Sequence, residues 1–67
     1  MEKEQASKIF SEAWGIMKKY GFDKLTDKQW ESIMAEEKKL TDKYKGNQNR
    51  LMLHILVGIN NYYQETE

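Results

Sequence analysis

The sequence predicts a small all-α protein, a three-helix bundle whose chain runs up, down and up. Apolar residues recur at three- and four-residue spacings along three segments, which is the pattern of amphipathic helices. Proline is absent and the four glycines are isolated, so long loops are not expected. The connections, of about five and about three residues, favour antiparallel neighbours. Because 67 residues leave room for one core, we expect residues 1–67 to form a single domain.

The first expected helix runs from about Lys3 to Tyr20. Gly21 follows it and is a natural left-handed C-terminal cap, after which Phe22 should contact Met17. We expect Trp14 on this helix, like Trp30 on the next, to lie in the core. The apolar face comprises Ala6, Ile9, Phe10, Ala13, Trp14, Met17 and Tyr20.

The second expected helix has the clearest start signal in the chain. Thr26 is a favourable N-cap, and Gln29 three residues later completes a capping box. Leu25 before the cap and Trp30 after it are placed to form a hydrophobic staple. Gly46 is expected to end this helix. Its apolar stripe comprises Trp30, Ile33, Met34, Leu40 and Tyr44.

The third expected helix begins near Asn47 or Asn49, since asparagine is a favourable N-cap, and runs to about Gln64. It is apolar around more of its circumference than two neighbours can cover, so we expect it to be the most buried of the three. Leu53 and Val57 form a second, smaller patch beside the main arc. That arc comprises Leu51, Met52, Ile55, Leu56, Ile59, Tyr62 and Tyr63.

Several functions are not expected from this composition. Cysteine is absent and histidine occurs once, as His54, so we expect no metal site, no cofactor and no nucleophilic catalysis. No catalytic or phosphate-binding motif is present, and no small-molecule substrate is evident. The longest apolar stretch, Leu51 to Ile59, is far short of the roughly 20 residues that span a bilayer. The acidic N-terminus has no apolar run, so we expect a cytoplasmic protein without a signal peptide.

Glu37 is the most informative single residue, because it lies close to the middle of the second helix's apolar stripe. A buried carboxylate costs several kcal/mol unless it is paired or protonated. Its head group is expected either in water or bonded to a tyrosine hydroxyl from Tyr20, Tyr62 or Tyr63. The alternative is that this part of the stripe stays open and faces a partner. An enzyme centred on Glu37 and His54 is not favoured, since nothing fixes the two side chains near each other.

The surface of the third helix favours a protein interaction module. Leu53 and Val57 add apolar surface to an already wide arc, and Gly58 beside them permits close approach of another helix. We therefore expect a protein partner or a homodimer to cover Leu53, Val57, Gly58 and Glu37.

Nucleic-acid binding through the connection between the second and third helices is the alternative function. A short turn between two helices, with polar residues leading the second, is typical of helix-turn-helix proteins. Against it, the 11 basic and 11 acidic residues give zero net charge, whereas affinity for DNA depends on neutralising phosphates. Nucleic-acid binding is therefore not favoured. The candidate contacts are Lys43, Lys45, Gln48, Asn49 and Arg50.

Four segments carry a resemblance to known proteins: Met17-Lys18-Lys19-Tyr20 at the end of the first helix, Trp30 early in the second, Lys43-Tyr44, and the Leu-rich Leu51–Ile59. With these segments the chain resembles short helical proteins of prophages and integrative mobile elements of Firmicutes. The resemblance implies an accessory protein of a mobile element that binds a host or element protein. It brings no activity and no functional residues.

Overall fold

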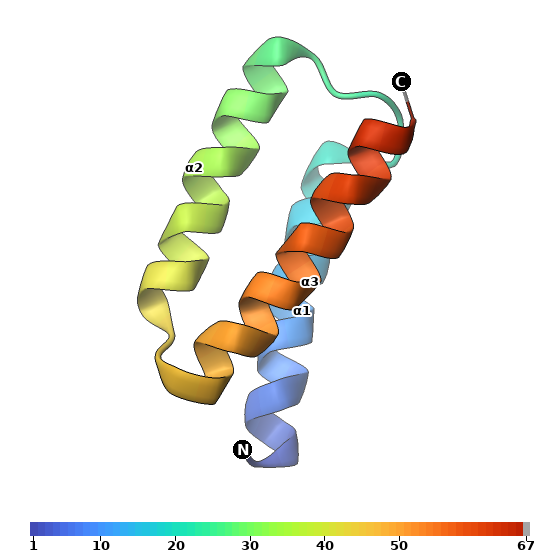
Figure 1. The fold of residues 1–67 in the computed structure, drawn as a ribbon. Coiled ribbons are helices and arrows are strands. Elements are labelled where there is room, and N and C mark those ends of the chain that lie inside the picture. The colour runs from blue at the N-terminus through green and yellow to red at the C-terminus, as the bar shows by residue number, and fades with distance from the viewer. Residues whose placement is uncertain (67) are drawn as a thin grey trace.

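The computed structural model describes residues 1–66, which form three α-helices and contain no strand. α1 spans Lys3–Tyr20, α2 spans Asp27–Lys43 and α3 spans Gly46–Glu65. The helices run alternately up and down the long axis of a body of 36 × 18 × 17 Å, with the N-terminus and the end of α3 at opposite ends (Figure 1). The all-α, up-down-up bundle predicted from the sequence is confirmed.

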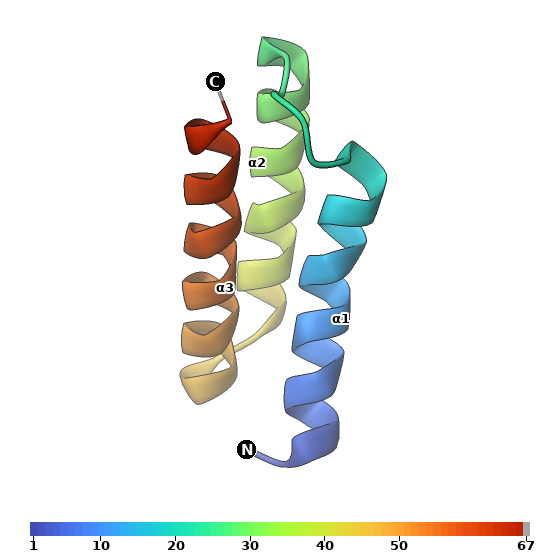
Figure 2. The same ribbon diagram turned by 90° about the vertical axis from the view of Figure 1, so that its right-hand side faces the viewer.

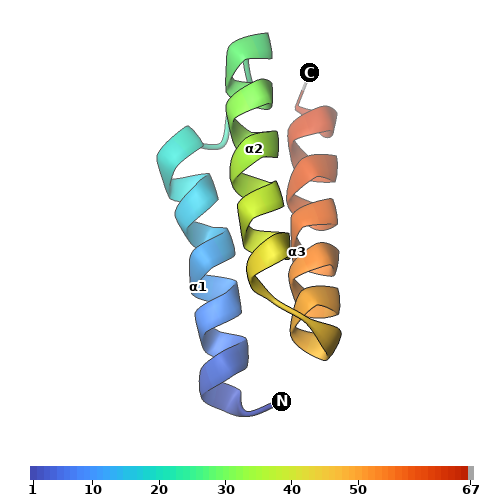
Figure 3. The same cartoon turned by 90° about the vertical axis from the view of Figure 1, so that its left-hand side faces the viewer.

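The core is built from one face of each helix, and α3 contributes most to it. α3 packs more closely against α1 than against α2, and the contact between α1 and α2 is the smallest of the three. The three helix axes are roughly aligned (Figures 2 and 3), which lets each apolar face run the length of the bundle. The buried core residues are Ile9, Ala13, Ile16, Leu25, Ile33, Met52, Leu56, Ile59 and Tyr63.

The start signal of α2 is confirmed, and α1 ends before Gly21 as expected, but Gly21 does not adopt the expected left-handed cap conformation. Thr26 Oγ1 accepts from the backbone N–H of Gln29 at 3.1 Å, and Gln29 Oε1 accepts from the backbone N–H of Thr26 at 2.9 Å. This capping box satisfies two helix-end donors reciprocally. Gly21 has a φ of 81° and donates its backbone N–H to the Met17 carbonyl at 2.8 Å. Its ψ of −163° differs from that of a left-handed helical cap, so the chain leaves α1 extended.

The expected boundary between α2 and α3 is wrong in two respects. Gly46 does not end α2, which stops at Lys43; it is the first residue of α3 and has a φ of 62°. Asn49 does not cap α3 either. Its Nδ2 donates to the backbone carbonyl of Thr41 at 2.7 Å, so it satisfies an acceptor at the end of α2. A C-terminal carbonyl of one helix is therefore paired by a side chain from the next.

Three apolar residues expected in the core are half exposed instead. The exposed fractions are 54% for Phe10, 49% for Trp14 and 53% for Met34. Each helix has only two neighbours, so the apolar face that it can bury is narrower than the apolar stripe in its sequence. Trp14 packs its ring beside Phe22 with the centroids 5.8 Å apart. Trp30, which was also expected in the core, is partly buried and packs against the core residues.

Candidate functional site

A groove of about 240 Å³ lies between α2 and α3 and brings together most of the predicted interface. Its exposed apolar side chains are Met34 from α2 and Leu53 and Val57 from α3, exposed by 53%, 45% and 55%. Leu53 and Val57 therefore form an accessible surface, as their separation from the main arc predicts. Gly58 does not line the groove. The lining residues are Met34, Glu37, Lys38, Thr41, Leu53, Leu56, Val57 and Asn60.

Glu37 forms part of the groove lining and is buried, with an exposed fraction of 6%. Asn60 Nδ2 donates to Glu37 Oε1 at 2.9 Å. Within the described residues, Glu37 Oε2 and Asn60 Oδ1 are both buried and have no hydrogen-bond partner. Burial raises the pKa of the Glu37 carboxyl, and the hydrogen bond from Asn60 only partly offsets this effect. The groove therefore contains a carboxyl group whose environment favours its neutral form.

The expectation that Glu37 reaches water or a tyrosine is wrong, because the three candidate tyrosines have other partners. The Tyr20 hydroxyl donates to Glu36, and those of Tyr62 and Tyr63 donate to the backbone carbonyls of Phe22 and Gly21. Asn60 was not singled out from the sequence. The helical spacing could have indicated it, because Asn60 follows Leu56 by four residues and Val57 by three, which places its amide between two apolar patches.

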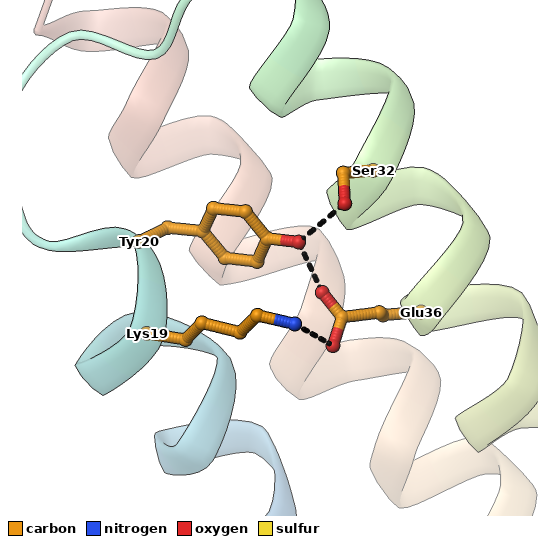
Figure 4. Close-up of polar contacts among 4 residues, drawn as sticks. All are labelled: Lys19, Tyr20, Ser32 and Glu36. Carbon is orange, nitrogen blue, oxygen red and sulfur yellow. Dashed lines mark hydrogen bonds and ion pairs between the residues drawn. The ribbon is translucent and has the colours of Figure 1, made fainter.

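A second groove, of about 320 Å³, lies between α1 and α2, and polar contacts tie the two helices together beside it. In the contact drawn in Figure 4, Lys19 Nζ lies 3.1 Å from Glu36 Oε1, while the Tyr20 hydroxyl lies 2.7 Å from Ser32 Oγ and donates to Glu36 Oε2. The hydrogen bond from Tyr20 and the charge and hydrogen bond of Lys19 lower the pKa of Glu36 against the opposing effect of burial. This carboxylate is thus held in its charged form by the end of the other helix.

The same arrangement recurs with the helices exchanged. Lys43 Nζ lies 3.1 Å from Glu12 Oε2, and the Tyr44 hydroxyl donates to Glu12 Oε1. Burial acts to raise the pKa of Glu12, but the hydrogen bonds from Tyr44 and Lys43 and the charge of Lys43 outweigh it and lower the pKa. The hydrogen bond to Glu12 raises the pKa of Tyr44 to about 12. The Lys19–Tyr20 pair at the end of α1 thus binds Glu36 of α2, and the Lys43–Tyr44 pair at the end of α2 binds Glu12 of α1.

The candidate nucleic-acid contacts are only partly available. Lys43 is paired with Glu12, and Asn49 is bonded to the Thr41 carbonyl. Lys45 and Arg50 are exposed, and Gln48 is half-buried. The basic residues that the sequence groups together are consequently divided between holding the fold and facing solvent.

A second, aromatic surface lies elsewhere, where the end of α1 and the connection after it meet α3. Its exposed aromatic side chains are Trp14, Phe22 and Tyr62, and Phe10 is exposed earlier on α1. The ring of Trp14 packs beside Phe22, and the Tyr62 hydroxyl donates to the Phe22 carbonyl at 2.6 Å. The Tyr62 hydroxyl therefore has its hydrogen-bond partner within the chain, while the aromatic rings themselves stay exposed.

His54 is exposed on α3. Among residues 1–66, no group of three or more histidine, cysteine, aspartate or glutamate side chains is arranged to hold a metal ion. None of the helices in this part of the chain has the length and apolar character needed to cross a bilayer. No protein-family model matches the chain, and no curated protein or solved structure is found to be similar to it.

Proposed function

We propose that this protein is a non-catalytic interaction module that binds one α-helix of a partner protein in the groove between α2 and α3. The observation that carries the proposal is that Met34, Leu53 and Val57 line one groove with about half of each side chain exposed. Contiguous apolar surface on a small soluble domain is typical of interaction sites. An amphipathic helix recognises such a groove with apolar residues spaced at three and four positions.

A single helix fits this surface better than a second copy of the chain does. A standard interface buries about 800 Å² on each partner. Half of each of three side chains supplies much less than that. The groove lies between two adjacent, roughly aligned helices, and a helix laid along it would pack its side chains between theirs. The homodimer expected from the sequence remains a competing outcome of the experiment below.

The proposal also includes the origin of the partner protein. A protein encoded by a mobile element or by its host is the kind of partner that the sequence resemblance implies. Nucleic-acid binding is not proposed, because Lys43 and Asn49 are already used within the fold.

The test uses the full chain and a display library of peptides of about 18 residues designed to form amphipathic helices. We expect selected peptides to share an apolar stripe. In a titration followed by amide NMR, they should perturb the signals around Met34, Leu53 and Val57. Val57→Asp should remove binding, because it places a charge against the apolar face of the peptide. Trp14→Gln is the matched control: it alters an equally exposed apolar residue on another face and should leave binding unchanged.

Three results would overturn the proposal. A display library can yield binders to any exposed apolar surface, so binding lost with Trp14→Gln and kept with Val57→Asp would assign the aromatic surface instead. A selection that yields no peptide dependent on Val57 would remove the groove as a docking site. Sedimentation showing a dimer that Val57→Asp separates would make a second copy of the chain the occupant.

A further inference from the structure

In the Glu37–Asn60 contact, two buried oxygen atoms lack a hydrogen-bond donor among the described residues. Asn60 Nδ2 donates to one carboxylate oxygen at 2.9 Å, which brings the carboxyl and amide groups together. The remaining oxygen of each group, Glu37 Oε2 and Asn60 Oδ1, is buried and has no donor among residues 1–66. A buried acceptor left without a donor destabilises the fold, because it has lost its hydrogen bond to water. A single proton on Oε2 would serve both atoms, because it converts one of them into a donor for the other.

We propose that Glu37 takes up a proton from solvent and donates Oε2–H to Asn60 Oδ1, so that the groove has a neutral acid–amide floor that accepts an uncharged aliphatic side chain of the partner helix. The second part of this inference rests on the proposed function and names the chemistry of its partner. In the neutral pair, each group donates one hydrogen bond and accepts one. The floor then presents no charge and no unpaired polar atom to an incoming side chain.

A proton satisfies this pair better than a cation from the partner would. Glu37 Oε2 and Asn60 Oδ1 are both shielded from solvent, so a lysine or arginine head group has no direct access to them. Burial raises the pKa of Glu37, which agrees with the neutral form.

The charged groups around the groove leave the pair without a counter-ion. Among residues 1–66, Lys38 from α2 is the one charged side chain that lines the groove with Glu37, and it is exposed. α3 lines the groove with Leu53, Leu56, Val57 and Asn60, none of which titrates. On α1, Glu12 is held by Lys43 beside the other groove.

The size and walls of the groove specify the side chain that it accepts. A cavity of about 150 Å³ lined by apolar residues admits benzene, so a groove of about 240 Å³ has room for one leucine- or phenylalanine-sized group. When such a group covers the floor, it removes water from the 6% of Glu37 that is still exposed, which further disfavours the carboxylate. Binding and protonation therefore favour each other, and affinity should rise as the pH falls.

The first experiment needs no partner. The ¹³C signal of the Glu37 side-chain carboxyl is followed by NMR over a pH titration of the full chain. We expect its midpoint to lie above the ordinary value of about 4.3, whereas Glu12 and Glu36 in the same spectra should titrate below it. Glu37 titrating together with those two would overturn the acid–amide pair, whatever the outcome of the peptide selection.

The second experiment compares two capped peptides that differ at one central position, leucine or lysine, and that contain no acidic residue or histidine. We expect the leucine peptide to bind more tightly at every pH. Its affinity should rise on acidification by up to about tenfold per pH unit while the carboxylate form predominates. Glu37→Gln, a permanently neutral analogue, should bind it with little pH dependence. His54→Gln should keep the wild-type dependence, which excludes the exposed histidine as the source.

The outcomes separate this inference from the proposed function. Preference for the lysine peptide, or a pH dependence that persists in Glu37→Gln, would overturn the neutral floor while leaving the groove as a docking site. Binding of neither peptide would count against the aliphatic occupant; together with a library that yields no groove-dependent peptide, it would remove the proposed function as well.

Discussion

Replacing Glu37 by glutamine should stabilise the protein near neutral pH. While Glu37 is ionised, its Oε2 and Asn60 Oδ1 are buried without donors among residues 1–66, and a glutamine can place an N–H where the carboxylate has a bare oxygen. The two amides would then exchange two hydrogen bonds. One unsatisfied buried acceptor costs about 1–3 kcal/mol, so we expect the free energy of unfolding to rise by about that amount at pH 7.5. For a domain of this size each kcal/mol corresponds to about 4–8 °C in Tm.

The stabilisation should depend on pH in a defined direction. The pKa of Glu37 is raised in the folded protein, so the protonated form is favoured by folding. Its contribution to stability is fully present below the unfolded pKa of about 4.3 and is lost as the pH rises through the folded pKa. The wild-type acid makes the same two bonds as glutamine once it is protonated. The difference in stability between Glu37→Gln and the wild type should therefore vanish near pH 4.

Urea denaturation followed by circular dichroism at both pH values measures this difference. Glu36→Gln is the matched control, because it neutralises a carboxylate whose pKa is lowered by Tyr20 and Lys19. It should destabilise the protein near neutral pH and matter less in acid, which is the opposite sign. If Glu37→Gln destabilises the protein at pH 7.5, or if its effect is the same at both pH values, the argument from unpaired acceptors is refuted.

Four further predictions concern the packing and the helices. Tyr44→Phe should remove one hydrogen bond to Glu12. Because the pKa of Glu12 is lowered in the folded protein, its ionised form stabilises the fold above the unfolded pKa, and this stability is lost as the pH falls through the folded pKa. Urea unfolding should therefore show a lower free energy of unfolding for the variant at pH 7 and little difference at pH 3. Gly46→Ala should cost about 1 kcal/mol because φ is 62° there. Gly58→Ala should gain up to about 1 kcal/mol by calorimetry, since an added Cβ meets nothing within 4 Å. Ile33→Ala should cost about 2–5 kcal/mol of unfolding free energy because Ile33 is fully buried, and circular dichroism melting should show an effect far larger than that of Val57→Ala on the surface.

The sequence by itself determined the helices and the ends that depend on local contacts. The apolar spacing and the Thr26–Gln29 capping box act over a few residues, so they predict α1 and the start of α2 at the observed positions. The exposure of Leu53 and Val57 was also predictable, because one helix cannot bury apolar residues around its whole circumference.

Only the tertiary structure decided which polar side chains meet. Glu37 pairs with Asn60 across 23 positions of sequence, and Asn49 bonds the end of α2 instead of starting its own helix. Each choice depends on the rotation of one helix against its neighbour, which helical periodicity does not specify. The same rotation left Trp14 and Met34 outside the core, because three helices bury less apolar surface than their sequences offer.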